Sequence, residues 1–166
     1  RSLNSYVERK GHAIFGIIQG STYPELRQTS SKFLQDFNFP GYAIGGLAVG
    51  EGRDLMFETL DSTVPTIDQS KPRYLMGVGK PEDIFGAVKR GIDMFDCVLP
   101  TRSGRTGLAF TWHGKIQIRN SKHKNDNSPL DSKVSKFDLN KYSKSYLNHL
   151  FNTNEMLASM IITLNN

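Results

Sequence analysis

The sequence predicts an α/β fold, and three observations support this prediction. Four short apolar runs begin near residues 13, 42, 73 and 94, and each ends at small or polar residues. Stretches with apolar residues at helical spacing lie between successive runs. Glycine and proline mark most of the boundaries. This alternation is typical of successive βα units, and four such units make either half of a barrel or a small open sheet.

The first unit shows the pattern clearly. Residues 13–18 are apolar on both faces, which is typical of a buried strand. Ser21 is a plausible N-cap for the helix that follows, and Pro24 suits its first turn. The turn residues at 38–41 end that helix. The remaining strands are predicted at 42–44, 73–76 and 94–97, and the remaining helices at 55–64 and 81–91.

The pattern changes after the fourth strand. Two apolar stretches at 108–111 and 115–118 flank Trp112-His113-Gly114, which predicts a β-hairpin. The polar segment 122–136 predicts a loop. Apolar residues between Tyr142 and Ile161 recur at helical spacing, which predicts an amphipathic helix broken near residues 152–154.

Length and composition exclude several classes of protein. With 166 residues and 37% hydrophobic residues, the chain has a globular composition, and it is too short for a complete (β/α)₈ barrel of about 250 residues. No apolar run approaches the length of a membrane span. Cys97 is the only cysteine, which excludes an internal disulfide and a multi-thiolate zinc site and favours a reducing compartment.

The net charge of +5 comes from one segment. Residues 97–125 contain six basic residues and no acidic residue, whereas the rest of the chain sums to −1. Such a segment is suited to phosphate groups, although a solvated basic face would carry the same charge.

Candidate binding residues stand where the predicted strands end, because ligands of open sheets and barrels meet the carboxyl ends of the strands. Those ends are Gln19-Gly20, Gly45-Gly46, Met76-Gly77 and Asp96-Cys97. They could hold a flat, hydrogen-bonding heterocycle beside one ionised oxygen nucleophile. Asp96 would attack an electrophilic carbon such as a sugar C1′.

Each of these residues also has a structural interpretation. Asp96 could cap a helix or pair with Arg102 or Arg105. Gln19 could bond to the next loop, the glycines could form a tight turn, and Met76 could belong to the core. Gly77-Val78-Gly79-Lys80 could bind a phosphate, although its spacing is not that of a Walker motif. Cys97 is best explained as a small buried residue, and the four histidines show no metal-ligand spacing.

Four longer segments together resemble one family. Residues 15–21, 45–51, 73–83 and 91–102 are similar, in order and with natural spacing, to the bacterial tRNA-guanine transglycosylases. The resemblance runs along the whole chain. It implies a TIM (β/α)₈ barrel with an appended zinc-binding helical region, of which this chain would be the C-terminal half. The implied domains are a partial barrel over 1–106 and a hairpin and helical region over 107–166.

The resemblance also implies an activity and a set of roles. The family exchanges the wobble guanine of certain tRNAs for the queuosine precursor preQ₁, as a pentosyltransferase. Asp96 would form the covalent bond to ribose C1′, and Met76 would stack on the base. Gln19 and Gly46 would hydrogen-bond the heterocycle, and the Leu47 carbonyl would accept from the aminomethyl group of preQ₁. The tRNA contacts would be Gly77, Val78, Gly79, Lys80, Pro81, Glu82, Asp83, Thr101, Arg102, Ser103, Gly104 and Arg105. Val49, where eukaryotic enzymes tend to have glycine, favours the bacterial type.

Two departures from the family pattern stand out. The three zinc cysteines of the family fall on Val134, Lys136 and Leu139, and the zinc histidine falls on Asn165, so we expect no zinc. The C-terminal helix must then be held by apolar packing alone. The general acid/base aspartate of the family, and a second aspartate that binds the purine edge, match no part of this chain.

These departures shape the expected behaviour. The expected partners are the tRNA anticodon loop and preQ₁ or guanine, and the expected location is the cytoplasm. We also expect either a homodimer or a separately supplied N-terminal half, and no association with a membrane. We expect the chain alone to be a poor catalyst. Two alternatives remain open: a non-catalytic tRNA-binding remnant, and a phosphate-binding α/β protein that uses Gly77-Val78-Gly79-Lys80.

Overall fold

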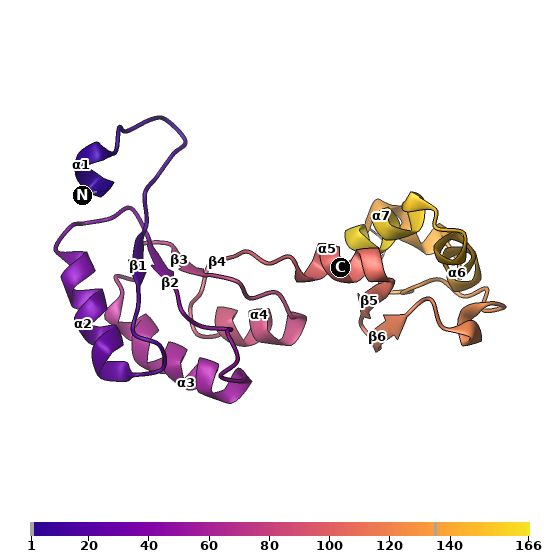
Figure 1. The fold of residues 1–166 in the computed structure, drawn as a ribbon, viewed down its shortest axis with the longest axis horizontal. Helices are drawn as coiled ribbons and strands as arrows, with labels where there is room; N and C mark the ends of the chain where they lie inside the picture. The colour runs from indigo at the N-terminus through magenta and orange to yellow at the C-terminus, as the bar shows by residue number, and fades with distance from the viewer. Residues whose placement is uncertain (1, 135) are drawn as a thin grey trace. The chain divides into compact units, whose positions relative to one another are not determined.

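The computed structural model describes residues 2–134 and 136–166, which form two compact units that divide between Cys97 and Val98. The first unit contains α1 (Ser2–Ser5) and an alternation of strands and helices (Figure 1). Its elements are β1 (Gly16–Ile18), α2 (Pro24–Gln35), β2 (Tyr42–Ile44), α3 (Arg53–Thr63), the 3₁₀ turn η1 (Val64–Thr66), β3 (Arg73–Leu75), α4 (Pro81–Val88) and β4 (Met94–Phe95). The predicted βα alternation is confirmed.

The four strands form one parallel sheet in the order β1-β2-β3-β4. Ile18 lies opposite Ile44, Ile44 opposite Leu75, and Leu75 opposite Phe95. Because the strands run the same way and each follows its predecessor in the sheet, their carboxyl ends meet along one edge.

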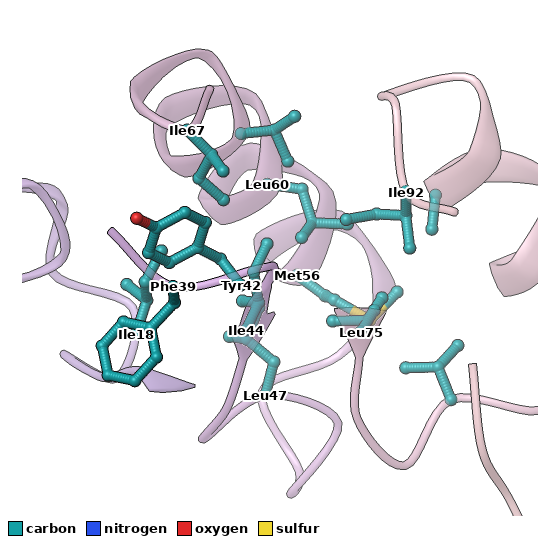
Figure 2. Packing of buried hydrophobic residues seen from close by; sticks show 13 residues of the cluster. Ile18, Phe39, Tyr42, Ile44, Leu47, Met56, Leu60, Ile67, Leu75 and Ile92 are labelled. Carbon is teal, nitrogen blue, oxygen red and sulfur yellow. The ribbon is translucent and has the colours of Figure 1, made fainter. Parts of the chain in front are cut away.

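One face of this sheet carries the core of the first unit. Ile18, Ile44 and Leu75 are fully buried and pack with Met56 and Leu60 of α3 (Figure 2). The alternate positions point the other way, and there Ile17 and Met94 are 43% and 45% exposed. An all-parallel sheet normally has both faces covered, so this face is unusual for its class.

The start of the first long helix corrects one prediction. Tyr23, not Ser21, occupies the N-cap position of α2, with extended backbone angles. Ser21 instead has a φ of 51°, in the left-handed region, so it belongs to the turn that leads into the helix. The predicted place of Pro24 in the first turn is confirmed.

The second unit contains helices around a small antiparallel sheet. Its elements are α5 (Leu99–Thr106), β5 (Leu108–Thr111), β6 (Gly114–Gln117), the 3₁₀ turns η2 (Ser121–His123) and η3 (Lys136–Lys141), α6 (Lys144–Asn152) and α7 (Met156–Asn165). β5 and β6 pair antiparallel, from Leu108 opposite Gln117 to Thr111 opposite Gly114. The predicted interruption of the C-terminal helix is confirmed, because α6 ends at Asn152 and α7 begins at Met156.

The division between the units lies nine residues before the expected boundary at 106. The reason is α5, a helix that the sequence analysis did not predict. It packs closely on α7 through Gly104, whose added Cβ would lie 2.3 Å from Thr163 Oγ1. These contacts place residues 98–106 with the helical region rather than with the sheet.

No helix among the described residues is long and apolar enough to cross a membrane.

Candidate active site

The predicted site residues of the first unit follow matched positions of the parallel sheet. Gln19, Gly45, Met76 and Asp96 each come directly after the paired residues Ile18, Ile44, Leu75 and Phe95. The backbone ladder continues into this row, because Gly45 N donates to Ile18 O at 3.0 Å and Met76 N donates to Ile44 O at 3.4 Å. The register therefore places an amide, a glycine, a thioether and a carboxylate along one edge of the sheet.

Asp96 is the best-defined side chain of this row. It is exposed, and its Oδ1 accepts hydrogen bonds from the Tyr74 hydroxyl at 2.6 Å and from the Gly77 N–H at 2.9 Å. Both hydrogen bonds engage Oδ1, and neither engages Oδ2. One oxygen is thus held in place while the other faces no donor of this pair, an arrangement suited to nucleophilic attack by Oδ2.

The same two donors lower the pKa of Asp96. The hydrogen bond from Tyr74, followed by that from Gly77, holds the pKa of the Asp96 carboxyl below its usual value, and desolvation opposes this only in part. Hydrogen bonds to the ionised form favour that form. The pKa of Tyr74 is raised, first by its bond to Asp96 and then by desolvation, so its proton stays on the phenol. Asp96 is therefore ionised throughout the neutral range.

Gln19 lies against the two glycines that follow β2. A Cβ added at Gly45 would lie 2.7 Å from Gln19 Nε2, and one added at Gly46 would lie 3.0 Å from Gln19 Oε1. Gly46 also has a φ of +65°, which an L side chain rarely adopts. Any larger residue here would displace the amide, so the glycines keep Gln19 at the rim. Leu47, the next residue, has its side chain in the core and is 4% exposed.

Arg27 of α2 is a buried charge that the sequence analysis missed. Its Nε donates to Ser21 O at 2.7 Å, Nη1 to Ile18 O at 3.3 Å and Nη2 to Gly46 O at 3.5 Å. Burial lowers its pKa, and the charge of Glu51 opposes that shift. This guanidinium joins the loop after β1 to the loop after β2, and so fixes the backbone that carries Gln19 and Gly46. An arginine on the inward face of an amphipathic helix, four residues before the small Ser31, was the available signal.

Glu51 closes the loop that follows Gly46. Its carboxylate accepts hydrogen bonds from the N–H groups of Ala48 and Val49. Desolvation raises the pKa of Glu51, but these backbone hydrogen bonds outweigh it and leave the pKa below its usual value. The backbone of the loop thus surrounds the carboxylate of Glu51, and the side chain of Val49 is exposed to solvent.

An apolar pocket of about 440 Å³ lies on the open face of the sheet, and Tyr74 links it to Asp96. Its lining includes Ile17, Ala43, Tyr74, Met76 and Met94. Tyr74, which the sequence analysis also missed, lines this pocket with its ring and reaches Asp96 with its hydroxyl. Strand alternation, which places Tyr74 and Met76 on the same face, could have found it.

The segment 77–83 forms the loop and first turn of α4. Arg53 pairs here with Glu82, at 2.9 Å, and with Asp83. The N–H of Gly77 is already used by Asp96. Two carboxylates at the start of α4 occupy the position where a phosphate would be stabilised by the helix N-terminus, which disfavours the phosphate-loop interpretation of Gly77–Lys80.

The other predicted RNA contacts lie in the second unit, on α5. Thr101, Arg102 and Arg105 are exposed, whereas Ser103 and Gly104 are buried. Of these residues of α5, only Thr101, Arg102 and Arg105 are therefore able to contact a ligand directly. Ser103 and Gly104 serve packing instead.

The comparisons with known proteins identify the family. A family model described as queuine tRNA-ribosyltransferase matches residues 1–166. The chain belongs to the queuine tRNA-ribosyltransferase family. The queuine tRNA-ribosyltransferases of Rickettsia peacockii and Rickettsia rickettsii (strain Sheila Smith) are each 59% identical to it over 166 residues, and that of Rickettsia bellii is 58% identical. The match covers all of this chain but 46% of each relative, in its C-terminal part.

Proposed function

We propose that this chain is the nucleophile-bearing half of a tRNA-guanine transglycosylase, a pentosyltransferase that exchanges the wobble guanine of tRNA for preQ₁ in queuosine biosynthesis. The observation that carries the proposal is an ionised Asp96, held by Tyr74 and Gly77 in one row with Gln19, Gly45 and Met76. The family match supports the class of reaction.

The exchange consists of two displacements at one carbon. Asp96 Oδ2 attacks ribose C1′ of the target nucleotide, a C1′–O bond forms, and the bond from C1′ to the guanine nitrogen breaks. The electron pair of that bond leaves with guanine, which takes up a proton. The incoming base, having lost a proton, then attacks C1′ through its own nitrogen and releases the Asp96 carboxylate. Two inversions leave the configuration unchanged, as in retaining glycosidases.

The rim residues are suited to a flat base that has left its stack. The amide of Gln19 offers a donor and an acceptor to the heterocycle, beside the backbone of Gly46. Met76 would stack on the base, and the carbonyl of Leu47 would accept from the aminomethyl group of preQ₁. The exposed Val49 is the feature that favours preQ₁ over the larger base of the eukaryotic type.

The proton transfers require a second carboxylate, which we assign to a half of the enzyme that this chain does not match. The relatives are more than twice as long as this chain. We propose that their remaining part supplies the acid/base aspartate and the other strands of a (β/α)₈ barrel, against the open face of the β1–β4 sheet. The working form would be this complex or a homodimer of it, acting on tRNA in the cytoplasm.

The deciding experiment measures incorporation of labelled guanine into a cognate tRNA. We expect negligible turnover by this chain alone and turnover when the N-terminal segment of a Rickettsia relative is added. Asp96→Asn should abolish that turnover, with Asp93→Asn as the matched control for a nearby exposed carboxylate. Turnover by the Asp96→Asn complex would refute the assignment of the nucleophile.

A trapping experiment separates the enzyme from a non-catalytic tRNA-binding remnant. Denaturing electrophoresis of the complex with tRNA in the absence of an incoming base should show a covalent protein–RNA band that Asp96→Asn removes. If tRNA binds tightly but no adduct forms under any condition, the remnant is the better description.

A further inference from the structure

The metal site that the family resemblance implies does not fit the residues of the second unit. Val134 and Leu139, which stand at two of the family's cysteine positions, pack in an apolar cluster with Leu130, Ile161 and Ile162. Hydrocarbon side chains cannot coordinate zinc. Among the residues that the structure describes, no group of three or more His, Cys, Asp or Glu side chains could hold a metal ion.

Asn165, at the family's histidine position, is already engaged. Its Nδ2 donates to Phe110 O at 2.8 Å, on strand β5, and lies 3.5 Å from Asn166 Oδ1. Its Oδ1 is buried and has no hydrogen-bond partner among the described residues. A single amide oxygen without companion ligands falls short of the full tetrahedral set that a structural zinc site uses.

The neighbouring Asn166 makes a wider set of bonds. Its Oδ1 accepts from Phe110 N at 2.9 Å, and its Nδ2 donates to Pro100 O and to Leu108 O, each at 3.0 Å. These partners lie in the first turn of α5 and in β5. One amide thus joins the end of α7 to two segments that are more than fifty residues away in the sequence, which is the kind of crosslink that a bound metal provides.

The crosslink falls where α5 and α7 are in closest contact. Gly104 of α5 lies so near α7 that an added Cβ would come within 2.9 Å of the backbone nitrogen of Thr163. The amides of Asn165 and Asn166 fix the end of α7 a few residues beyond this contact. The position of α5, with the exposed Arg102 and Arg105, therefore depends on the end of α7.

We propose that the second unit folds without a metal ion and that a clamp made by the side-chain amides of Asn165 and Asn166 replaces the metal crosslink. The apolar cluster around Leu139 fills the space between the helices, and the clamp sets the position of α5 against β5 and α7. This inference rests on packing and hydrogen bonds within residues 98–166 and does not depend on the proposed function.

The first test measures metal content and its effect on unfolding. The chain, purified from cells grown with added zinc and without an affinity tag, should contain well under one zinc per chain by inductively coupled plasma mass spectrometry. Its melting temperature should be unchanged by EDTA. Stoichiometric zinc together with a lower melting temperature in EDTA would overturn the proposal.

The second test addresses the clamp itself. Asn166→Ala should lower the melting temperature by about 5 °C and should remove hydrogen-exchange protection from the Phe110 amide. Asn166→Asp keeps the acceptor for Phe110 N and loses the donor, so it should retain that protection while still lowering the melting temperature. Asn140→Ala, a change at an exposed position of η3, is the matched control. If Asn166→Ala and the control give the same melting temperature and the same Phe110 exchange rate, the clamp does not exist.

Discussion

At the residue scale, Asp96 depends on Tyr74 for its orientation and for its lowered pKa. A carboxylate at the exposed end of a strand would rotate freely if nothing held it. The phenol and the Gly77 N–H both bind Oδ1, which restricts that rotation and favours the ionised form. Tyr74 acts through Asp96, so we regard it as a positioning residue.

Removal of the phenol tests this role. In Tyr74→Phe the pKa of Asp96 should rise toward the ordinary value of an aspartate, because the hydrogen bond that lowers this pKa most is lost. The carboxylate then becomes protonated at a higher pH. The acidic limb of the pH–rate profile, measured for the complex with the N-terminal segment of a Rickettsia relative, should therefore also move to higher pH. The ¹³Cγ chemical shift of Asp96, followed by NMR across acidic pH, measures the pKa in the chain alone.

Tyr23→Phe is the control for this change, because Tyr23 is a tyrosine that is 60% exposed at the start of α2. It should leave the Asp96 titration unaltered. An Asp96 titration curve that is the same in Tyr74→Phe as in the original chain would rule out Tyr74 as the group that sets this pKa.

At the element scale, α5 is the clearest case in which tertiary packing, rather than local helix propensity, determines the secondary structure. Its sequence, LPTRSGRT, contains glycine and few strong helix formers, and the sequence analysis predicted no helix there. In the structure Gly104 allows α5 to approach α7, and the helix ends at Gly107 in the left-handed conformation that suits glycine. Burial against α7 outweighs the weak local propensity.

The close contact of Gly104 with α7 predicts that a larger residue at this position lowers the stability of the chain. Gly104→Ala should destabilise the chain by about 1–3 kcal/mol, because the new methyl group meets the backbone as well as the side chain of Thr163. Thermal unfolding followed by circular dichroism measures the loss. Thr101→Ala on the exposed face of the same helix should change stability by less than about 0.5 kcal/mol. Equal melting temperatures for the two variants would contradict the close packing of α5 on α7.

The exposed face of α5 carries the predicted RNA contacts. Arg102→Ala and Arg105→Ala should each weaken binding of an anticodon stem-loop and should reduce the salt dependence, by roughly 0.7 in the log–log slope per lost phosphate contact. Fluorescence anisotropy over a range of KCl concentrations measures both quantities. Lys32→Ala, on the exposed surface of α2, should alter neither. A salt slope unchanged by both arginine variants would remove α5 from the RNA-binding surface.

At the scale of the whole molecule, the sheet of the first unit has one apolar face that the described residues leave open. The partial exposure of Ile17 and Met94 on that face is costly in water, and the faces of all-parallel sheets are normally covered. Our proposal assigns the cover to the rest of the barrel. The same face adjoins Tyr74 and Asp96, so closing it would also exclude water from the site.

The partly exposed apolar face of the sheet should bind an apolar dye, and a partner that covers this face should displace the dye. The chain alone should enhance the fluorescence of the apolar dye ANS, and addition of the N-terminal segment of a Rickettsia relative should reduce the signal. Met94→Gln should lower the signal of the chain alone, whereas Met160→Gln, at an exposed methionine of α7, should lower it less. Dye fluorescence that the N-terminal segment leaves unchanged would contradict its placement on this face.

The sequence by itself was sufficient to predict the βα alternation, the parallel sheet and the row of residues that directly follow the strands. Apolar runs and their turn residues are local signals, and strand order follows from short crossovers. The placement of Gln19, Gly45, Met76 and Asp96 at matched positions followed from these signals. The absence of zinc, which the family resemblance implies because a valine or leucine cannot replace a thiolate, stays a prediction.

Only the tertiary structure decided what lies around those residues. The bond from Tyr74 to Asp96, the three carbonyls bound by Arg27, and the packing of α5 on α7 all join segments distant in sequence, so no local pattern encodes them. The clamp at Asn165 and Asn166 is of the same kind. An amide at the end of a helix has many possible partners, and the free energy of burying α5 and β5 beside it selects the ones it has.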